Sequence, residues 1–265
     1  MQINKQTKAN TKKLRVIMLC GQGVSSRIMY NGIKDDVDCA GVILEESTSA
    51  LVLAKQRVIR LGYLRTLGQI AFVLLNKILF TLDKSEIKKI ISQLSLSDEH
   101  FDDRVITRIP TINSEAVVRK IIELSPDLII VNGTRIIGKK LLERISVPII
   151  NTHMGITPRY RGVHGGYWAI ANNDDVNCGV TIHLVDEGID TGDVLYQAKI
   201  ESSEKDTFNT YPIRQIAAAI PLMKKVIRDV SLNNLKTTSG ITPSQLWHHP
   251  TIWQYLYYWS KNGCR

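Results

Sequence analysis

The chain has 265 residues, 44% of them hydrophobic and 22% charged, a composition that supports a folded core and excludes a disordered chain. Its length suits one large domain, or one domain with a small appendage. The net charge of +9 favours anionic partners such as phosphates, carboxylates, nucleic acid or a lipid surface, without choosing among them. Reduced thiols in a cytoplasmic protein are expected, with no disulfide framework and no metal site, from the scattered positions of Cys20, Cys39, Cys178 and Cys264.

The first part of the chain predicts a tail and then two strands. Residues 1–13 are polar and basic and are expected to form a flexible tail, with no apolar run after them that would make a secretion signal. Residues 15–20 (RVIMLC) are apolar and are closed by glycines, which predicts a buried parallel strand that enters a turn. Ser25 or Ser26 is expected to cap the helix that follows, and residues 37–44 predict a second strand.

A long helical section is expected over residues 49–96, with breaks at Gly62 and Gly68. Within it, residues 66–82 (TLGQIAFVLLNKILFTL) are strongly apolar and follow a basic run from Lys55 to Arg65. Three polar residues interrupt this stretch, and it is short for a membrane span. A buried helix is therefore the expectation, and a helix lying on a membrane surface is the alternative.

The next part of the chain alternates helix and strand. Residues 114–124 carry apolar side chains at helical spacing and stop at a Ser-Pro pair; residues 127–131 then predict a strand. A short helix is expected over 139–144 and another strand over 147–150. This order predicts an α/β fold with an open, mostly parallel, Rossmann-like sheet flanked by helices. Ligands bind such sheets at the carboxyl edge, where the loops at 132–137 and 151–162 are expected.

The last part of the chain predicts a helix over 164–172, strands over 179–184 and 194–200, and a helix over 217–230. We therefore expect a main domain over 14–200, with 49–96 as a helical insertion, and a C-terminal extension over 201–265. Core packing is the expected role of the extension's aromatic residues, with nucleotide stacking or dimer contacts as alternatives. These residues are Trp247, Trp253, Tyr255, Tyr257, Tyr258 and Trp259.

The densest group of chemically capable residues begins at Asn151, directly after a predicted strand. Asn151 and His153 are two residues apart, so in extended backbone their side chains project to the same side. Acyl transfer needs such a pair, one group to hold a developing oxyanion and one to supply a proton. A later Gly-rich loop offers Asp186, Glu187 and Asp190, and a carboxylate near His153 would raise the pKa of the imidazole and orient the ring. From spacing alone, each of these residues is also explained as a turn or cap residue.

Three segments together resemble the signature of the formyltransferase family, which includes the glycinamide ribonucleotide, methionyl-tRNA and amino-sugar N-formyltransferases. They are NTHMGITPRYRG from Asn151, GVTIHLVDEGID from Gly179 and TGDVLYQ from Thr191. The resemblance covers about residues 14–201 at the level of the fold and is sharp from 126 to 197. It implies a folate-dependent enzyme with N10-formyltetrahydrofolate as co-substrate and no metal. By the same resemblance, Asn151 and protonated His153 stabilise an oxyanion, and Asp190 keeps His153 protonated and helps to move a proton.

Further roles follow from the resemblance. The loop NGTRII from Asn132 is similar to the one that lines the pterin pocket in the family, although it is one residue shorter than the common form. The resemblance implies cofactor binding by Arg135, Ile136, Ile137, Val185, Asp186, Glu187 and Ile189. It places the amine substrate near Gly21, Gly23 and Ser25, and a Gly-rich turn that opens a helix can also hold a phosphate. Arg159 and Arg161 are expected to steer anionic groups, or else to be solvated loop residues.

The choice of amine rests on length and composition. About 65 residues follow residue 200, and they do not predict the barrel domain that the tRNA-modifying relatives carry. The glycinamide ribonucleotide enzymes are shorter and lack the 49–96 insertion. The chain therefore looks most like the enzymes that formylate nucleotide-linked 4-amino sugars for surface polysaccharide, such as O-antigen or lipopolysaccharide. A nucleoside-diphosphate sugar is the expected partner; a peripheral membrane contact and a homodimer are left open.

Two other classes are alternatives. Phosphoribosylglycinamide formyl transfer in purine synthesis is the first. A non-catalytic protein is the second, either a basic nucleic-acid binder or a folate binder without turnover. No nucleic-acid partner is expected, because leucines dilute the basic residues and no binding motif is present. The intact Asn151, His153 and Asp190 favour an enzyme.

Overall fold

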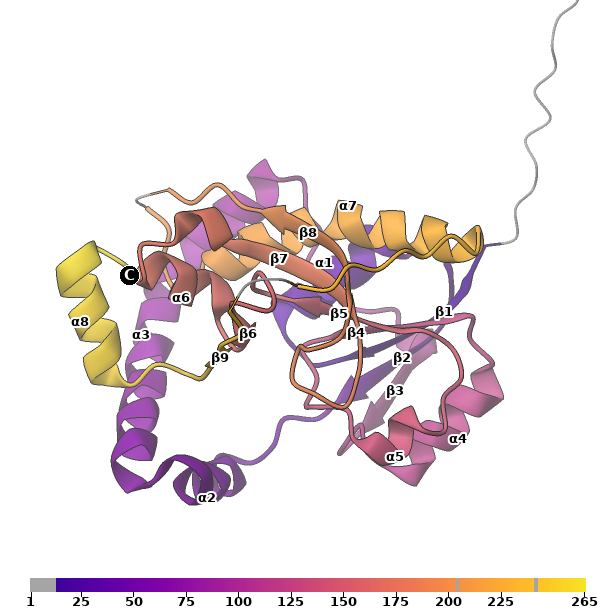
Figure 1. Cartoon of the computed structure of the whole chain (residues 1–265), viewed down its shortest axis with the longest axis horizontal. Coiled ribbons are helices and arrows are strands. Elements are labelled where there is room, and N and C mark those ends of the chain that lie inside the picture. The colour runs from indigo at the N-terminus through magenta and orange to yellow at the C-terminus, as the bar shows by residue number, and fades with distance from the viewer. Residues whose placement is uncertain (1–12, 204, 241–242) are drawn as a thin grey trace, which may run out of the picture.

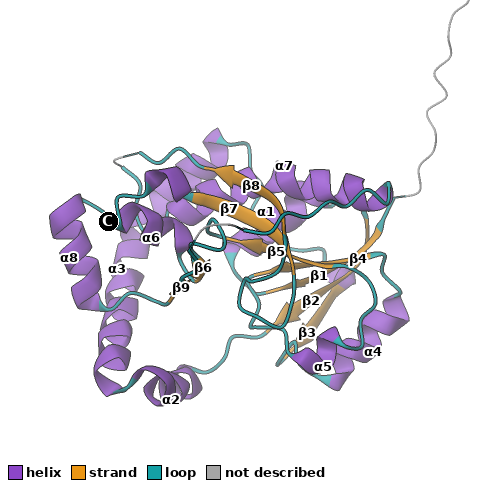
Figure 2. Cartoon of the chain, in the orientation of Figure 1, coloured by secondary structure: helices purple, strands orange, loops and turns teal. Residues whose placement is uncertain are grey.

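The structure is a computed structural model that describes residues 13–203, 205–240 and 243–265. The expected tail, 1–13, lies outside the described residues apart from Lys13. Within the described chain, one sheet has the strand order β3-β2-β1-β4-β5-β7-β8 (Figures 1 and 2). Its strands are β1 (Arg15–Cys20), β2 (Asp38–Glu45), β3 (Ile106–Ile109), β4 (Leu128–Asn132), β5 (Ile149–His153), β7 (Gly179–Leu184) and β8 (Val194–Lys199).

The sheet is parallel from β3 to β5, and β7 and β8 extend it in the antiparallel sense. This confirms the predicted open, mostly parallel α/β fold. A separate pair of short parallel strands, β6 (Arg161–Gly162) and β9 (Leu246–Trp247), joins the C-terminal part of the chain to the loop after β5.

Helices cover both faces of the sheet (Figure 1). Residues 16, 18 and 20 of β1 belong to the apolar core on one face, and residues 17 and 19 to the core on the other. Successive strand residues point to opposite faces, so β1 is apolar throughout because both of its faces are buried. The helices are α1 (Val24–Ile33) and α7 (Tyr211–Ser231) on the first face, and α4 (Glu115–Leu124) and α5 (Lys139–Leu142) on the second.

Several expected boundaries differ from the structure. Gly23, not Ser25 or Ser26, is the N-cap of α1, and no side chain caps that helix; the Ser26 hydroxyl instead donates a hydrogen bond to the Asn132 carbonyl. The short strand β3 was not predicted, because its sequence ITRI has too few apolar residues for a clear pattern. Helix α7 begins at Tyr211 rather than at 217, with a proline in its first turn, where proline is tolerated.

The helical insertion contains two helices that meet at Gly62, which has φ +80° and ends the first of them, so this predicted break is confirmed. The second expected break, Gly68, is wrong: it lies inside the longer helix, where a Cβ would overlap the Trp253 ring. Gly68 therefore allows a close helix–helix contact rather than a bend. The two helices are α2 (Ala50–Leu61) and α3 (Tyr63–Gln93), and the partner of Gly68 is in α8 (Ile252–Asn262).

A third apolar cluster joins α3, α8 and α6 (Gly165–Ala171) to the body. Phe72 is fully buried there, with its ring centroid 4.9 Å from that of Phe208 and 5.0 Å from that of Tyr255. Only this side of α3 is covered, and many of its apolar side chains are exposed. The expectation of a buried helix over 66–82 is therefore wrong for half of its surface.

The aromatic residues of the C-terminal extension serve mainly as packing. The Trp247 ring stacks on Tyr160 and on Trp168, with centroids 5.6 and 4.8 Å away, so both of its faces have partners. Tyr255 is buried in the same cluster. Core packing is thus confirmed for these two residues, whereas Trp253, Tyr257 and Trp259 are partly exposed.

Candidate active site

A cavity of about 580 Å³ lies at the carboxyl edge of the parallel strands, where the sequence predicted a ligand site. This volume is within the usual range for small-molecule sites. Its walls come from the end of β4 and its loop (131–137), from the end of β5 (151–154) and from the loop after β7. Residues of α2 and of the segment 246–249 close the remaining side.

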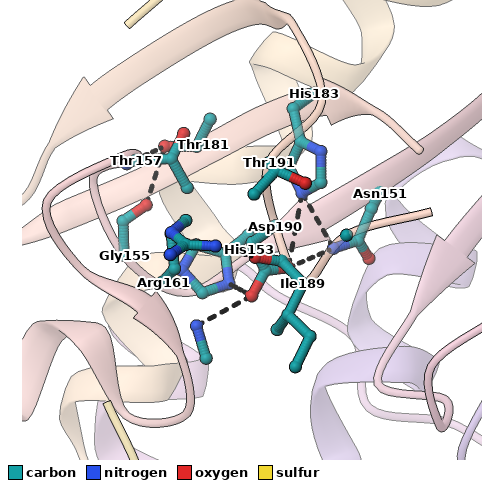
Figure 3. A network of polar contacts seen from close by, with 12 residues as sticks. Asn151, His153, Gly155, Thr157, Arg161, Thr181, His183, Ile189, Asp190 and Thr191 are labelled. Carbon is teal, nitrogen blue, oxygen red and sulfur yellow. Dashed lines mark hydrogen bonds and ion pairs between the residues drawn. The ribbon is translucent and has the colours of Figure 1, made fainter. Parts of the chain in front are cut away.

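Asn151 and His153 both lie on β5 and point to the same side of the sheet (Figure 3). Each faces a residue of the antiparallel neighbour β7, Asn151 opposite His183 and His153 opposite Thr181. His153 is only 5% exposed, so its ring is held by protein groups rather than by water.

Asp190 reaches this pair from the loop after β7. It has φ +50°, the left-handed conformation that aspartate tolerates better than most residues. Its Oδ2 lies 3.3 Å from His153 Nδ1 and accepts a hydrogen bond from the Gly162 amide at 2.8 Å, while Oδ1 accepts one from Asn151 Nδ2 at 3.2 Å. The three residues that the sequence singled out for catalysis therefore form one cluster.

Both ring nitrogens of His153 face acceptors. Its Nε2 donates to the Tyr160 carbonyl at 2.6 Å, and its Nδ1 faces the Asp190 carboxylate, so a doubly protonated ring would satisfy both partners. Burial lowers the pKa of His153, and Asp190 and the Tyr160 carbonyl raise it without reversing the downward direction. The carboxylate acts on the pKa in the direction expected from the sequence, but burial outweighs it and the net direction is downward.

Asp190 stays ionised in this surrounding. Burial alone would raise the pKa of Asp190, but the charge of His153, the neighbouring His183 ring and the Gly162 amide outweigh it and bring the pKa to about 2. Asp190 therefore carries a negative charge throughout the physiological pH range, and that charge is the main support for a proton on His153.

Asp190→Asn is expected to lower the pKa of His153 further, because it removes the negative charge that favours the imidazolium and leaves the burial unchanged. If a protonated His153 is the active form, activity falls as the pH rises through this pKa, so the alkaline limb of kcat moves to lower pH. An NMR titration of the His153 ring measures the shift. Asp193→Asn, in the same loop but exposed, is the control; an unchanged His153 pKa in Asp190→Asn would contradict this electrostatic account.

His183 is a member of the cluster that the sequence analysis missed. Its Nδ1 donates to the Leu184 carbonyl at 2.6 Å, which leaves Nε2 free to accept from Asn151 Nδ2 at 3.1 Å. Both N–H groups of the Asn151 side-chain amide thus have acceptors in the site, His183 and Asp190. One of these two hydrogen bonds must break before Asn151 can donate to a ligand. Its place opposite Asn151 comes from the antiparallel pairing of β5 with β7, so the sequence alone held no signal for it.

The predicted cofactor residues line the cavity, with one exception. Arg135, Ile136, Ile137, Val185, Asp186 and Ile189 are in its wall. Glu187 is not: its carboxylate lies 3.0 Å from Lys139 Nζ, and both side chains are exposed. Asp186 turns inward on its own loop and accepts from the Gly188 amide and the Thr191 hydroxyl. The loop after β7 is thereby fixed by its own polar groups.

Arg135 anchors its loop rather than offering a free charge. Its Nε donates to Glu45 Oε1 at 2.8 Å and its amide to Glu45 Oε2 at 2.8 Å. Glu45 is buried at the end of β2 and also accepts from the Ile112 amide at 2.7 Å. This single carboxylate therefore sets the position of the 133–137 wall.

Glu45→Gln is expected to raise the KM for the ligand that the 133–137 loop binds, with a smaller change in kcat. Loss of the charge weakens the two hydrogen bonds that Glu45 accepts from Arg135. A combined loss equal to one hydrogen bond to a charged group, about 1.5–3 kcal/mol, corresponds to a rise of about 10- to 100-fold. Asp102→Asn, which breaks an exposed carboxylate–arginine pair with Arg104, is the matched control. A fall in kcat alone would show that Glu45 does not act through the loop.

The predicted substrate residues are less well placed. Only Ser25 lines the cavity; Gly21 and Gly23 do not. Gly21 is explained by packing, since a Cβ there would overlap the Gly133 carbonyl. Arg159 pairs with Asp174 at 2.6 Å, and Arg161 donates to the Ile189 carbonyl at 2.9 Å, where it supports the loop that carries Asp190. Both arginines thus hold neighbouring loops in place, and neither is free to steer an anionic group.

The cavity contains polar atoms that suit a ligand. The Asn132 Oδ1, the Thr152 hydroxyl and the Tyr167 hydroxyl are buried without a hydrogen-bond partner in the described chain, and all three residues line the cavity. Buried groups of this kind are normally paired, so a ligand with both donors and acceptors fits here. Among residues 13–203, 205–240 and 243–265, no group of three His, Cys, Asp or Glu side chains is arranged to hold a metal.

The comparison with protein families identifies the class. The model of the formyl transferase family, "Formyl transferase", matches residues 56–227, which includes the Asn151, His153 and Asp190 cluster. The chain belongs to this family.

Individual relatives differ in what they formylate. The chain is 37% identical over 120 residues to a methionyl-tRNA formyltransferase of Halothermothrix orenii and 40% identical over 106 residues to one of Anaeromyxobacter sp. strain K. These matches cover 45% and 40% of this chain and only 38% and 34% of the relatives. The chain thus aligns with less than half the length of these curated relatives.

Solved structures show the same fold. A sugar N-formyltransferase from Shewanella sp FDAARGOS_354 has a TM-score of 0.56 at 18% identity, over 88% of this chain and 76% of that one. A phosphoribosylglycinamide formyltransferase from Anaplasma phagocytophilum has a TM-score of 0.57, also at 18% identity, over 89% and 98%. Because both substrate classes score alike, the fold does not choose between them.

Proposed function

We propose that this protein transfers a formyl group from N10-formyltetrahydrofolate to the primary amine of a nucleotide-linked 4-amino sugar in the cytoplasm. The observation that carries the proposed reaction is the cluster of Asn151, His153 and Asp190 in the wall of a ligand-sized cavity, within a chain of the formyl transferase family. The sugar part of the proposal has separate support, given below.

The cavity suits the proposed co-substrate. N10-formyltetrahydrofolate supplies an activated formyl group, and its heterocycle offers both hydrogen-bond donors and acceptors. The 131–137 loop would hold this ring through backbone groups, the unpaired Asn132 Oδ1 and the apolar side chains of Ile136 and Ile137. Val185 and Ile189 add apolar contacts from the opposite loop.

The side chains then have distinct tasks. Asn151 donates a hydrogen bond to the formyl oxygen, where negative charge develops as the uncharged amine adds to the formyl carbon. His153 donates to the same oxygen once one of its two N–H groups leaves its present acceptor, the Asp190 carboxylate or the Tyr160 carbonyl. Asp190 orients the His153 ring, and its negative charge raises the pKa of the imidazole against the burial that lowers it, which favours the protonated form. Because its own pKa is about 2, Asp190 is a poor proton acceptor. The proton that leaves the amine is expected to pass through water to N10 of the folate, as the bond between N10 and the formyl carbon breaks and tetrahydrofolate leaves.

The charge at the other end of the cavity supports an anionic substrate. Arg57 and Arg60 of α2 line the cavity. These arginines lie in the insertion that distinguishes the chain from shorter family members, and a diphosphate is the type of group that a pair of guanidinium ions binds well. The net charge of +9 acts in the same direction.

An absorbance assay for tetrahydrofolate release tests the proposal with a panel of amines. The panel holds thymidine-, guanosine- and uridine-diphosphate amino sugars, glycinamide ribonucleotide and methionyl-tRNA. Fast turnover with one sugar nucleotide is the expected result. Turnover with glycinamide ribonucleotide or methionyl-tRNA alone would overturn the substrate, and failure to bind folate at all would overturn the reaction.

Arg57→Gln and Arg60→Gln are each expected to raise the KM for the sugar nucleotide about 10- to 100-fold, the value of one lost hydrogen bond to a charged group. The kcat is expected to change less, because neither arginine contacts Asn151, His153 or Asp190. Arg119→Gln is the control, because Arg119 lies on α4 and outside the cavity wall. If both variants keep the wild-type KM, the anionic end of the substrate lies elsewhere.

A further inference from the structure

The first half of α3 has an apolar face with no covering in the described chain. Tyr63, Leu67, Ile70, Leu74 and Ile78 recur at helical spacing and form one stripe. Leu67, Leu74 and Ile78 are 63%, 57% and 62% exposed, well above what a core helix shows. Exposed apolar surface of this extent is uncommon in proteins that have no partner for it.

The opposite face of α3 is fixed to the protein. Gln69 donates to the His249 carbonyl at 2.8 Å, and Phe72 is buried between aromatic rings. Asp83 accepts from the Thr207 hydroxyl at 2.8 Å and from the Asn209 amide at 2.9 Å. The helix is long and apolar enough by composition to cross a membrane, but a spanning position would break these bonds and carry the Asp83 carboxylate into lipid.

All the charged side chains of the segment 50–82 are positive. Residues 50–82 contain Lys55, Arg57, Arg60, Arg65 and Lys77 and no acidic residue. On α2 the exposed Leu51, Val52 and Ile59 accompany these basic groups. Apolar side chains with interspersed Lys and Arg are typical of helices that lie in the interface of an anionic bilayer.

Aromatic residues lie beside this face. Helix α8 lies beside α3 (Figure 1) and packs against it at Gly68. It exposes Trp253, Tyr257 and Trp259 by 43%, 54% and 44%. Tryptophan and tyrosine are enriched at the level of lipid headgroups, where one part of the ring is apolar and the other polar.

A second copy of the chain fits this face less well. A two-fold dimer uses the same surface on both subunits, so the uniformly basic 50–82 segment of one copy would lie near that of the other. Like charges brought together in an interface oppose association. A surface of negative charge compensates them instead.

We propose that α2, the 63–82 part of α3 and the exposed aromatics of α8 dock on an anionic phospholipid bilayer, parallel to its surface. The helix α2 also contributes Arg57 and Arg60 to the cavity, so docking places the proposed active site next to the lipid. This inference does not depend on the proposed reaction.

Flotation of the full chain with vesicles tests it. The probes are vesicles of phosphatidylglycerol and phosphatidylcholine in equal amounts, and vesicles of phosphatidylcholine alone. Binding to the anionic vesicles is expected, with much weaker binding to the neutral ones. Raising the salt from 0.1 M to 1 M shortens the Debye length from about 10 Å to about 3 Å and is expected to weaken binding. Binding to neither vesicle would overturn the proposal.

Two variants separate the apolar and the charged contributions. Leu67→Glu, Leu74→Glu and Ile78→Glu together are expected to abolish flotation. Lys55→Gln, Arg65→Gln and Lys77→Gln together are expected to weaken it about a hundredfold, at about 1 kcal/mol for each basic residue near the surface. None of these residues lines the cavity, so turnover in solution reports separately on the proposed function.

The matched control is a triple variant at equally exposed apolar positions elsewhere, Ile122→Glu, Val176→Glu and Leu232→Glu, which are 56%, 62% and 61% exposed. It should float like the wild type, and circular dichroism checks that every variant is folded. Equal loss in this control would show that no particular face docks. Sedimentation velocity tests for a dimer. If the wild type is a dimer that does not bind vesicles, and the Leu67, Leu74 and Ile78 variant is a monomer, the face binds a second copy of the chain and the proposal is overturned.

Discussion

His153→Ala is expected to lower kcat for formyl transfer about a thousandfold. The variant removes a hydrogen-bond donor to the developing negative charge and leaves the Asp190 carboxylate without its charged partner. Asp190→Ala is expected to have a similar effect, because the His153 ring would lose both its orientation and the charge that favours its proton. Single-turnover measurement at saturating co-substrate and amine reads the chemical step directly.

His100→Ala is the matched control, since His100 is exposed and lies outside the cavity wall. Circular dichroism establishes that each variant is folded. Near-normal kcat in a folded His153→Ala protein would refute the assigned roles, whatever the substrate.

Phe72→Ala is expected to lower the free energy of unfolding by about 3–5 kcal/mol, the usual cost of removing a buried aromatic ring. Phe72 is fully buried and contacts both Phe208 and Tyr255, so its loss leaves a cavity where α3 and α8 meet the body. Urea denaturation followed by fluorescence measures the change.

Phe80→Ala on the same helix is the control, because Phe80 is 40% exposed and the removal of its ring leaves no closed cavity. Its effect is expected to stay within about 0.5 kcal/mol, as for most surface substitutions. If the two variants lower the free energy of unfolding by the same amount, α3 is not attached to the body through Phe72.

The parallel sheet could be predicted because its strands are buried on both faces. The apolar run of β1 defines its own limits, and the structure has the same bounds, 15–20. The bounds predicted for the antiparallel strand β7, 179–184, are also those of the structure. The strand β3 could not be predicted this way, because it lies at the sheet edge and only one of its four residues, Ile109, is fully buried.

The cluster at β5 was accessible from sequence only in part. Asn151 and His153 could be paired because they are two residues apart on a predicted strand. His183 could not be added, because its place depends on the antiparallel register of β7 against β5, which is a long-range property. The effect of a neighbouring carboxylate on the pKa of His153 could be predicted, but the net downward direction could not, because it depends on the burial of the ring.

Helix α3 shows why composition alone misled. Its 66–82 segment is apolar on both faces, which is the pattern of a buried helix. Only the structure shows that one face packs on Phe208 and Tyr255 while the other, with Leu67 and Leu74, is exposed. Gly68 was misassigned for a related reason: its partner, Trp253, is far away in sequence.

The most direct test of the central claim follows the formyl carbon itself. The protein is given N10-formyltetrahydrofolate labelled with carbon-13 in the formyl group, together with the sugar nucleotide that turns over fastest, and the products are examined by NMR. The account predicts the label in a formamide on the sugar amine, with one tetrahydrofolate released for each formamide, and none of this in His153→Ala. Label recovered as free formate, or remaining on the folate, would contradict formyl transfer to an amine.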